Sequence, residues 1–205
     1  MDNLTIVEGA GDAEIARWIA GVLAGALASG GPVAFTVPGG ASPFPIFERL
    51  AGEPLDWRRL AVWPNDDRAV PEQHPASNTG RIRAIFAPAG AQVVSLSEME
   101  QVPRFALAWL GMGEDGHVAS LFPSANPRVD DPQAIRRLTP HPLPPEAPFA
   151  RITLTLPALL ASERLLLVIR GAAKRAVFEA AAAGASDSPI ARLLAGARQP
   201  VTCFV

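Results

Sequence analysis

Cysteine, net charge and long hydrophobic runs are all scarce in this sequence, and each absence excludes a class of protein. A single cysteine, Cys203, rules out an internal disulfide and favours a reducing compartment. The formal net charge of −2 leaves no basic excess of the kind that nucleic-acid-binding proteins carry. The longest apolar stretch, residues 154–169, is interrupted by Glu163 and Arg164 and cannot cross a bilayer. The N-terminal residues lack the basic and apolar regions of a signal peptide. We therefore expect a soluble cytoplasmic protein that binds neither nucleic acid nor membranes.

What the sequence does contain is a regular alternation of strand and helix patterns. At 205 residues, 49% of them apolar, the chain can bury a sizeable core and suits one domain, residues 1–205. Short apolar runs predict strands at residues 4–7, 33–37, 60–63, 92–96, 105–110, 151–156, 164–169 and 201–205. Helical spacing predicts helices at residues 12–29, 44–50, 77–86, 157–161, 171–183 and 190–194. This alternation favours an α/β layer fold, although residues 97–104 are too few for the usual crossover helix.

The most informative stretch is residues 109–123, where an apolar strand runs into a glycine-rich turn. Three glycines, two carboxylates and one imidazole lie there: Gly111, Gly113, Gly116, Glu114, Asp115 and His117. Residues 118–122 then predict a helical turn that Pro123 ends. Open α/β sheets place their chemistry at the carboxyl ends of strands, so this is a candidate catalytic turn. The alternative is a tight connection with a solvated aspartate and histidine.

A second glycine turn, residues 38–43, follows the predicted strand at 33–37. Gly39 and Gly40 free backbone N–H groups to face a ligand, and Ser42 is a predicted helix cap. A helix N-terminus behind such a turn suits phosphate. An ordinary capped connection would carry the same pattern.

Charged and amide side chains follow the predicted strand at 60–63. Asp66, Asp67 and Arg68 either hold a substrate's hydroxyls and charge or form a solvated rim. Asn78 either caps the next helix or faces the pocket.

Two later segments add to the candidate site. Lys174 lies in the first turn of the helix at 171–183, where an anionic ligand would offset its repulsion by the helix dipole. A surface lysine is the alternative. The proline-rich residues 138–148 predict a stiff pocket wall.

Taken in order, these stretches resemble the 6-phosphogluconolactonase family, within the glucosamine-6-phosphate isomerase superfamily, over nearly the whole chain. Residues 111–123, G-M-G-E-D-G-H-V-A-S-L-F-P, differ from the family's pattern only at Val118. Residues 38–43 are similar to its S-G-G-S-T-P loop, and residues 66–78 to D-E-R-x-V-P followed by H and S-N. Residues 151–155 and 171–174 resemble its R-I-T-L-T and G-x-x-K.

The resemblance implies a three-layer Rossmann-like α/β fold with a mostly parallel central sheet flanked by helices. It also implies hydrolysis of 6-phospho-D-glucono-1,5-lactone to 6-phospho-D-gluconate, a step of the oxidative pentose phosphate pathway. The family uses no metal and no cofactor, and His74, His117 and His141 show no metal-ligand spacing. A monomer and a homodimer are both compatible with the sequence.

Given such a reaction, each candidate residue has an expected role. We expect His117 to be the base that activates water, because an imidazole titrates near neutral pH. Arg68 is expected to stabilise the oxyanion, and Asp115 to orient the imidazole or bind a sugar hydroxyl. The expected phosphate site comprises Gly39, Gly40, Ser42, Lys174 and Arg151. The further substrate-binding or supporting candidates are Asp66, Asp67, Asn78, Gly113 and Gly116.

Besides Val118, the sequence departs from the family at three other places. Asp67 replaces the usual glutamate, Ala41 replaces a hydroxyl residue, and the helix before the central strand is largely missing. A glucosamine-6-phosphate deaminase or isomerase is a second hypothesis, but those enzymes typically continue Asp-Gly-His with Phe-Asn-Glu-Pro, where this chain has residues 118–122. A non-catalytic sugar-phosphate sensor is a third, and such regulators usually carry a DNA-binding segment that the sequence does not show.

Overall fold

The structure is a computed structural model that describes residues 3–145 and 147–205. Within these residues the centre is a seven-stranded sheet in the order β1-β10-β9-β6-β2-β3-β5, and each neighbouring pair runs parallel. Its strands are β1 (Leu4–Val7), β2 (Val33–Val37), β3 (Leu60–Pro64), β5 (Gln92–Val93), β6 (Leu107–Leu110), β9 (Leu165–Val168) and β10 (Val201–Phe204). The predicted parallel central sheet is confirmed.

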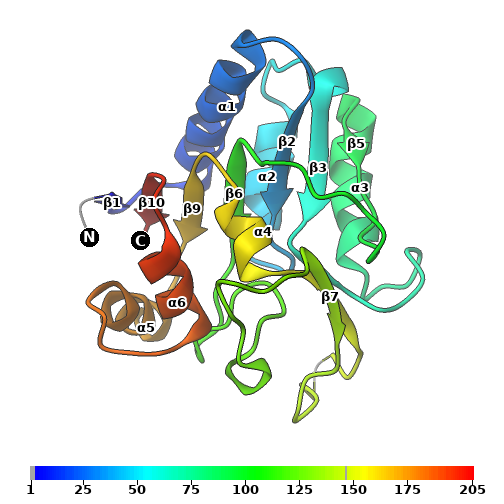
Figure 1. The fold of residues 1–205 in the computed structure, drawn as a ribbon. Coiled ribbons are helices and arrows are strands. Elements are labelled where there is room, and N and C mark those ends of the chain that lie inside the picture. The colour runs from blue at the N-terminus through cyan, green and yellow to red at the C-terminus, as the bar shows by residue number, and fades with distance from the viewer. Residues whose placement is uncertain (1–2, 146) are drawn as a thin grey trace.

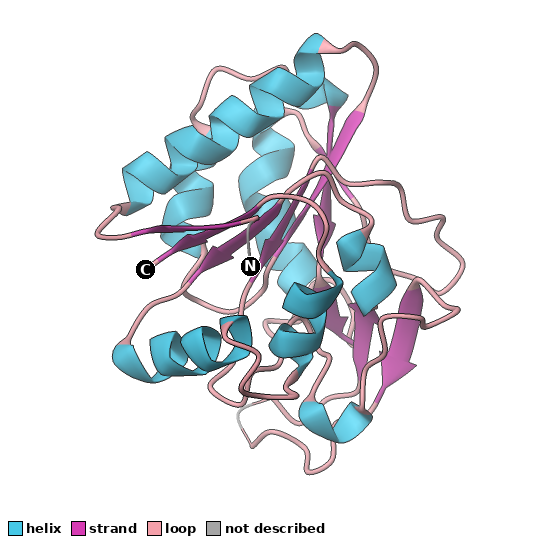
Figure 2. Ribbon diagram, turned by 60° about the vertical axis from the view of Figure 1, so that its left-hand side comes forward, coloured by secondary structure: helices cyan, strands magenta, loops and turns pink. Residues whose placement is uncertain are grey.

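Helices cover both faces of this sheet (Figures 1 and 2). On one face lie α1 (Asp12–Ala28), α2 (Phe44–Ala51) and α3 (Asn78–Ala89), and on the other lie α4 (Leu156–Leu160), α5 (Ala172–Ala182) and α6 (Pro189–Gly196). In β6, Leu107 and Trp109 join the core under α1–α3, whereas Ala108 and Leu110 join the core under α4–α6. Because strand side chains alternate, one apolar strand supplies both cores. The three-layer prediction is confirmed.

A small antiparallel sheet that the sequence did not predict lies beside the central one (Figure 2). In the described chain it has three strands in the order β4 (Asp66–Arg68), β8 (Arg151–Leu154) and β7 (Ile135–Leu138). β4 follows β3 after one residue, Asn65, and places Arg68 opposite Arg151. The small sheet thereby carries three predicted site residues: Asp66 and Asp67, which are buried, and Arg68, which is partly buried.

The prediction of a helical turn at residues 118–122 is wrong. Ala119 has φ of +51°, and Val118 forms isolated bridges with Met112 and Leu121. The Ser120 backbone N–H donates to the Thr153 hydroxyl, so it is not available to a helix. A 3₁₀ turn, Pro123–Ala125, forms only after this segment.

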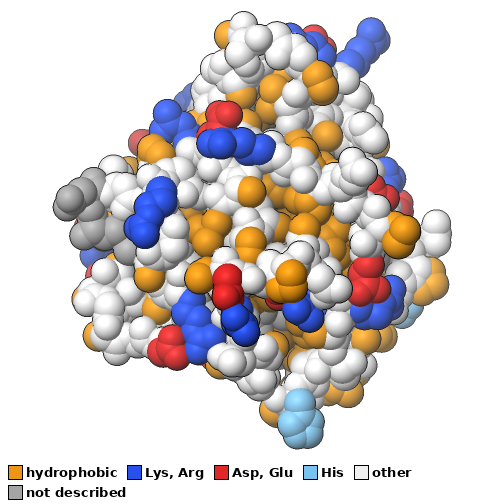
Figure 3. All heavy atoms as spheres, in the orientation of Figure 1, with side chains coloured by type: hydrophobic (Ala, Val, Ile, Leu, Met, Phe, Trp, Pro, Cys, Tyr) orange, Lys and Arg blue, Asp and Glu red, His pale blue; other side chains and the backbone are white. Residues whose placement is uncertain are grey.

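The shortened connection before β6 forms no helix, as its length predicts: residues 94–106, all described, contain none. The partly buried side chains of Val94, Leu96 and Val102 pack there against the core under α4–α6. On the side of the molecule that Figure 3 shows, hydrophobic side chains are visible near the middle of the surface. No helix among the described residues is long and apolar enough to cross a bilayer.

Candidate active site

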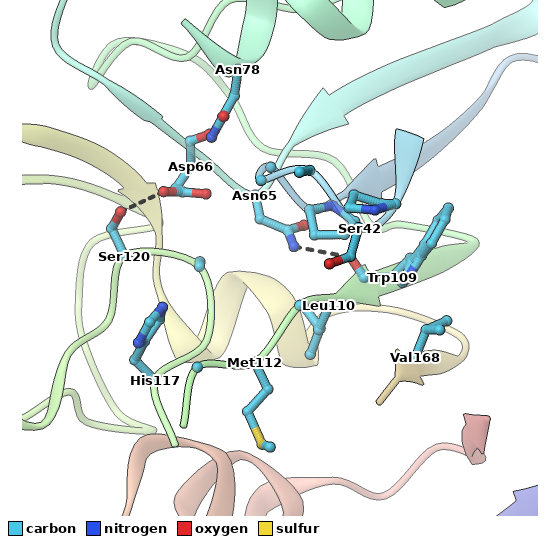
Figure 4. A pocket seen from close by; sticks show the side chains of 18 of the residues that line it. Ser42, Asn65, Asp66, Asn78, Trp109, Leu110, Met112, His117, Ser120 and Val168 are labelled. Carbon is cyan, nitrogen blue, oxygen red and sulfur yellow. Dashed lines mark hydrogen bonds between the residues drawn. The ribbon is translucent and has the colours of Figure 1, made fainter. Parts of the chain in front are cut away.

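The carboxyl ends of four central strands open onto one cavity of about 650 Å³ (Figure 4). β2 leads into Gly39, β3 into Asp66, β6 into Gly113 and β9 into Arg170, and all four residues line it. The wall also contains these predicted residues: Gly40, Ser42, Arg68, Asn78, His117, Arg151 and Lys174. Since parallel strands end at one edge of a sheet, residues distant in sequence meet here. Three predicted residues, Asp67, Asp115 and Gly116, lie outside the wall.

His117 is held by a carboxylate from its own turn. Its Nδ1 lies 2.6 Å from Asp115 Oδ1, which also accepts the His117 backbone N–H at 3.1 Å. Because a carboxylate only accepts, Nδ1 carries the hydrogen, and the neutral ring then has its lone pair on Nε2. The ring packs 4.7 Å from the Phe122 ring, between centroids, and its side chain is 30% exposed. Figure 4 shows it directed toward the side of the cavity where Asp66 and Ser120 lie.

Gly116 contributes backbone geometry to this turn and does not reach the cavity. Its φ is +77°, and a Cβ there would fall 2.7 Å from Ser188 Cβ on the segment before α6. Both constraints require glycine. Gly116 therefore lets this turn pack against the segment that leads into α6.

Asp66 and Asp67 face opposite sides of β4, as the two-residue period of a strand requires. Asp66 points into the cavity and accepts a hydrogen bond from Ser120 Oγ. Burial raises the pKa of the Asp66 carboxyl, although Ser120 and Arg68 act in the opposite direction. The cavity therefore holds a carboxyl group whose ionisation is disfavoured.

Asp67 organises the start of α3. Its carboxylate accepts hydrogen bonds from the Ser77 hydroxyl and from the backbone N–H groups of Arg68, Asn78 and Thr79. A negative charge that pairs with free N–H groups at a helix N-terminus is favourable. Ser77, not Asn78, is the N-cap, accepting from the Gly80 N–H. Asn78 is thereby left to face the cavity, where it lies 3.1 Å from Arg68 Nη1.

Arg68 and Arg151 are paired across the small sheet, and neither forms a salt bridge with a carboxylate of the described residues. Arg68 donates to the Ala76 carbonyl, and Arg151 donates to the carbonyls of Phe149 and Ala147. Burial, and then the charge of Arg68, lowers the pKa of Arg151. Two cations that are held by neutral carbonyls favour an anion beside them.

The turn after β2 presents unused backbone donors. Within the described chain, the N–H groups of Gly39, Gly40, Ala41 and Ser42 donate to no protein acceptor. A side chain at Gly39 would displace Asn78, because a Cβ there would fall 2.1 Å from Asn78 Nδ2. The predicted Ser42 cap is wrong: Pro43 holds the N-cap position of α2, with no side-chain cap. The Ser42 hydroxyl remains available to a ligand.

The cavity wall includes polar residues that the sequence reasoning missed: Asn65, Arg81, Ser120 and Arg170. Asn65 is buried between three strands, accepting from Thr36 Oγ1 at 2.7 Å and donating to the Trp109 carbonyl at 2.9 Å. Arg81 lies three residues beyond Asn78 on α3, a spacing that places both on one helix face. That spacing was the signal in the sequence that could have identified Arg81.

Charge in the wall is strongly biased toward cations. Its cationic residues are Arg68, Arg81, Arg151, Arg170 and Lys174, whereas its only described carboxyl is that of Asp66. No cluster of three or more His, Cys, Asp or Glu in residues 3–145 and 147–205 could hold a metal ion. The wall therefore suits an anionic ligand.

Comparison with known proteins identifies the family. The model of the family described as glucosamine-6-phosphate isomerases/6-phosphogluconolactonase matches residues 10–100 and 87–202. A 6-phosphogluconolactonase of Pseudomonas aeruginosa is 38% identical over 191 residues, covering 82% of this chain and 79% of the relative. A 6-phosphogluconolactonase of Neisseria meningitidis is 34% identical over 215 residues, covering 93% and 91%.

Solved structures agree. A 6-phosphogluconolactonase from Shewanella baltica superposes with a TM-score of 0.85 at 26% identity, covering 98% of this chain and 97% of that one. A putative 6-phosphogluconolactonase from Neisseria gonorrhoeae gives a TM-score of 0.82 at 30% identity, covering 98% of each chain. The chain belongs to the glucosamine-6-phosphate isomerase/6-phosphogluconolactonase family, and within it to the 6-phosphogluconolactonases.

Proposed function

We propose that this protein hydrolyses 6-phospho-D-glucono-1,5-lactone to 6-phospho-D-gluconate. The observation that supports this most is that His117 and the Gly39–Ser42 turn line one cavity, at the ends of two different strands. An enzyme that hydrolyses a phosphorylated lactone needs a base to activate water and donors to bind the phosphate. The imidazole, with its lone pair on Nε2, suits the first role, and the unused amides suit the second. The names of the similar proteins agree with this substrate.

His117 activates the water. Nε2 takes a proton as the water oxygen attacks the lactone carbonyl carbon, and Asp115 stabilises the resulting imidazolium through Nδ1. When the tetrahedral intermediate collapses, the C1–ring oxygen bond breaks and the imidazolium returns the proton to the departing oxygen. One residue therefore serves as base and then as acid.

Arg68 faces the developing negative charge. Its guanidinium is anchored by the Ala76 carbonyl and lies beside Asn78, so its position is set before substrate binds. Preorganised donors of this kind stabilise an oxyanion without a reorganisation cost. Arg151 opposite adds to the positive potential.

The phosphate lies at the other end of the cavity. The amides of residues 39–42, the Ser42 hydroxyl and Lys174 supply its donors. Asp66 and Asn78 bind sugar hydroxyls between the phosphate and the lactone carbonyl. Phosphate binding at a distance from the reacting carbon contributes equally to the ground and transition states.

The deciding experiment incubates the purified protein with freshly prepared 6-phosphogluconolactone and, separately, with glucosamine 6-phosphate. Acid release from the lactone is followed after subtraction of spontaneous hydrolysis. Lactone turnover with no ammonia from the amino sugar supports the proposal. Ammonia release alone would favour the deaminase hypothesis, and binding without turnover of either would favour the sensor.

A further inference from the structure

Arg81 lies at the mouth of the cavity and belongs to none of the sequence motifs. It is on α3, three residues after the cavity residue Asn78, and its side chain is exposed. The next arginine on this helix, Arg83, is held by Glu72, with Nε 2.5 Å from Oε1. In the part of the chain that the structure describes, Arg81 has no carboxylate partner of this kind.

Two contacts hold Arg81 over the turn that follows β2. The guanidinium carbon lies 3.8 Å from the centroid of the Phe44 ring, on α2, and Nη1 lies 3.4 Å from the Gly40 carbonyl. A guanidinium that stacks its flat face on an aromatic ring keeps its N–H groups in the plane, where they remain free to donate. Arg81 is therefore positioned without using most of its donors.

The contact with Gly40 also concerns the turn itself. In a trans peptide the N–H points away from the C=O, so Arg81 fixes the direction of the Ala41 N–H by holding the Gly40 carbonyl. Ala41 has no side-chain donor of its own. Arg81 and the four residues with unused amides line the same cavity, with the guanidinium on the carbonyl side of the Gly40–Ala41 peptide and the Ala41 N–H on the opposite side.

We propose that Arg81 binds the phosphate group of the substrate, from outside the turn formed by residues 39–42. The inference rests on the proposed function in taking the ligand to be a sugar phosphate monoester. The guanidinium closes the side of the phosphate that the amides leave to solvent, and Phe44 keeps it in position. Arg81 takes no part in proton transfer, because it contacts the end of the substrate remote from the carbonyl.

The test compares Arg81→Met with Arg49→Met, a matched control on exposed α2 surface. Each variant is assayed with 6-phosphogluconolactone and with unphosphorylated glucono-1,5-lactone. A hydrogen bond between charged groups corresponds to a change of about 10-fold or more, so Arg81→Met should raise KM for the phosphorylated lactone about 10-fold at unchanged kcat. It should leave kcat/KM for the unphosphorylated lactone unchanged, and Arg49→Met should match wild type on both.

An unchanged KM, or an equal loss on both lactones, would overturn the proposal, the latter because it indicates a structural role. Thermal unfolding of both variants checks the fold. Binding of inorganic phosphate, measured by calorimetry, separates this inference from the proposed function. If wild type hydrolyses no lactone but Arg81→Met binds phosphate about 10-fold more weakly than wild type, the proposed reaction is wrong and the role of Arg81 in binding phosphate stands. If the two bind phosphate equally, Arg81 is not a phosphate ligand.

Discussion

Gly113 lies directly against the ring of His117: a methyl group at Gly113 would fall 2.2 Å from both Nδ1 and Cε1. The same methyl would fall 2.7 Å from Asp115 Oδ1, the oxygen that holds the ring. Since real Cβ atoms do not approach so closely, any side chain at Gly113 must displace the imidazole or its partner. The absence of a side chain at Gly113 therefore leaves the space that the His117 ring occupies.

Gly113→Ala should therefore lower kcat by roughly 10- to 100-fold while the protein stays folded, because a displacement of about 1 Å is enough to cost that much. Steady-state assays with 6-phosphogluconolactone, alongside circular dichroism, check this. Wild-type turnover by the variant would mean that the position of the imidazole does not matter.

Gly25→Ala is the contrasting substitution, and it should stabilise the protein. Gly25 lies in the interior of α1, exposed, and a Cβ there meets nothing within 4 Å. Alanine is favoured over glycine in a helix by about 1 kcal/mol, so the free energy of unfolding should rise by about that much. Urea titration measures the change, and a decrease would show that α1 is strained at this position.

Lys174→Ala should raise KM by about 10-fold or more with little change in kcat. Lys174 lines the cavity from the first turn of α5, and it forms no ion pair with the described residues. Initial-rate assays over a range of lactone concentrations separate the two constants. A fall in kcat at constant KM would instead place Lys174 near the reacting carbon.

Asp66→Asn should change how stability depends on pH. The pKa of Asp66 is raised by burial above its ordinary value of 3.8, so the folded protein keeps this proton at pH values where the unfolded chain releases it. The contribution of Asp66 to stability is therefore greatest below about pH 4 and is lost as pH rises through the folded pKa. An asparagine side chain does not ionise, so the Asp66→Asn variant does not lose stability in this way as pH rises.

Relative to wild type, Asp66→Asn should accordingly gain stability between pH 4 and pH 7. Urea unfolding at both pH values measures the difference between the variant and wild type. Identical pH dependence in the two proteins would indicate that Asp66 ionises normally in the folded state.

The central sheet was predictable because most of its strands are short apolar runs. They alternate with segments whose apolar residues recur at helical spacing. β4 was not, because Asp66–Arg68 is three charged residues with no hydrophobic pattern, and its strand conformation comes from pairing with β8. β7 was missed for a related reason: two exposed arginines occupy the middle of Ile135–Leu138. In both segments the strand conformation depends on pairing with β8 and not on the local sequence pattern.

Within the site, the glycine turns and the His117 segment were recognisable from sequence, and the structure brings them to one cavity. The direction of each carboxylate was not recognisable. Asp67 faces the N-terminus of α3 only because β4 is a strand, and that strand was not predicted. The spacing from Asn78 could have placed Arg81 on the cavity face of α3, but its contacts with Phe44 and Gly40 join segments about 40 residues apart and could not be predicted from the sequence.

The central claim is that the His117 imidazole activates water. The most direct measurement is kcat of His117→Ala with 6-phosphogluconolactone, corrected for spontaneous hydrolysis, in a protein shown by circular dichroism to be folded. We predict a decrease of at least ~100-fold, because general base catalysis typically contributes that much. Turnover close to that of wild type would contradict the claim and remove His117 from the mechanism.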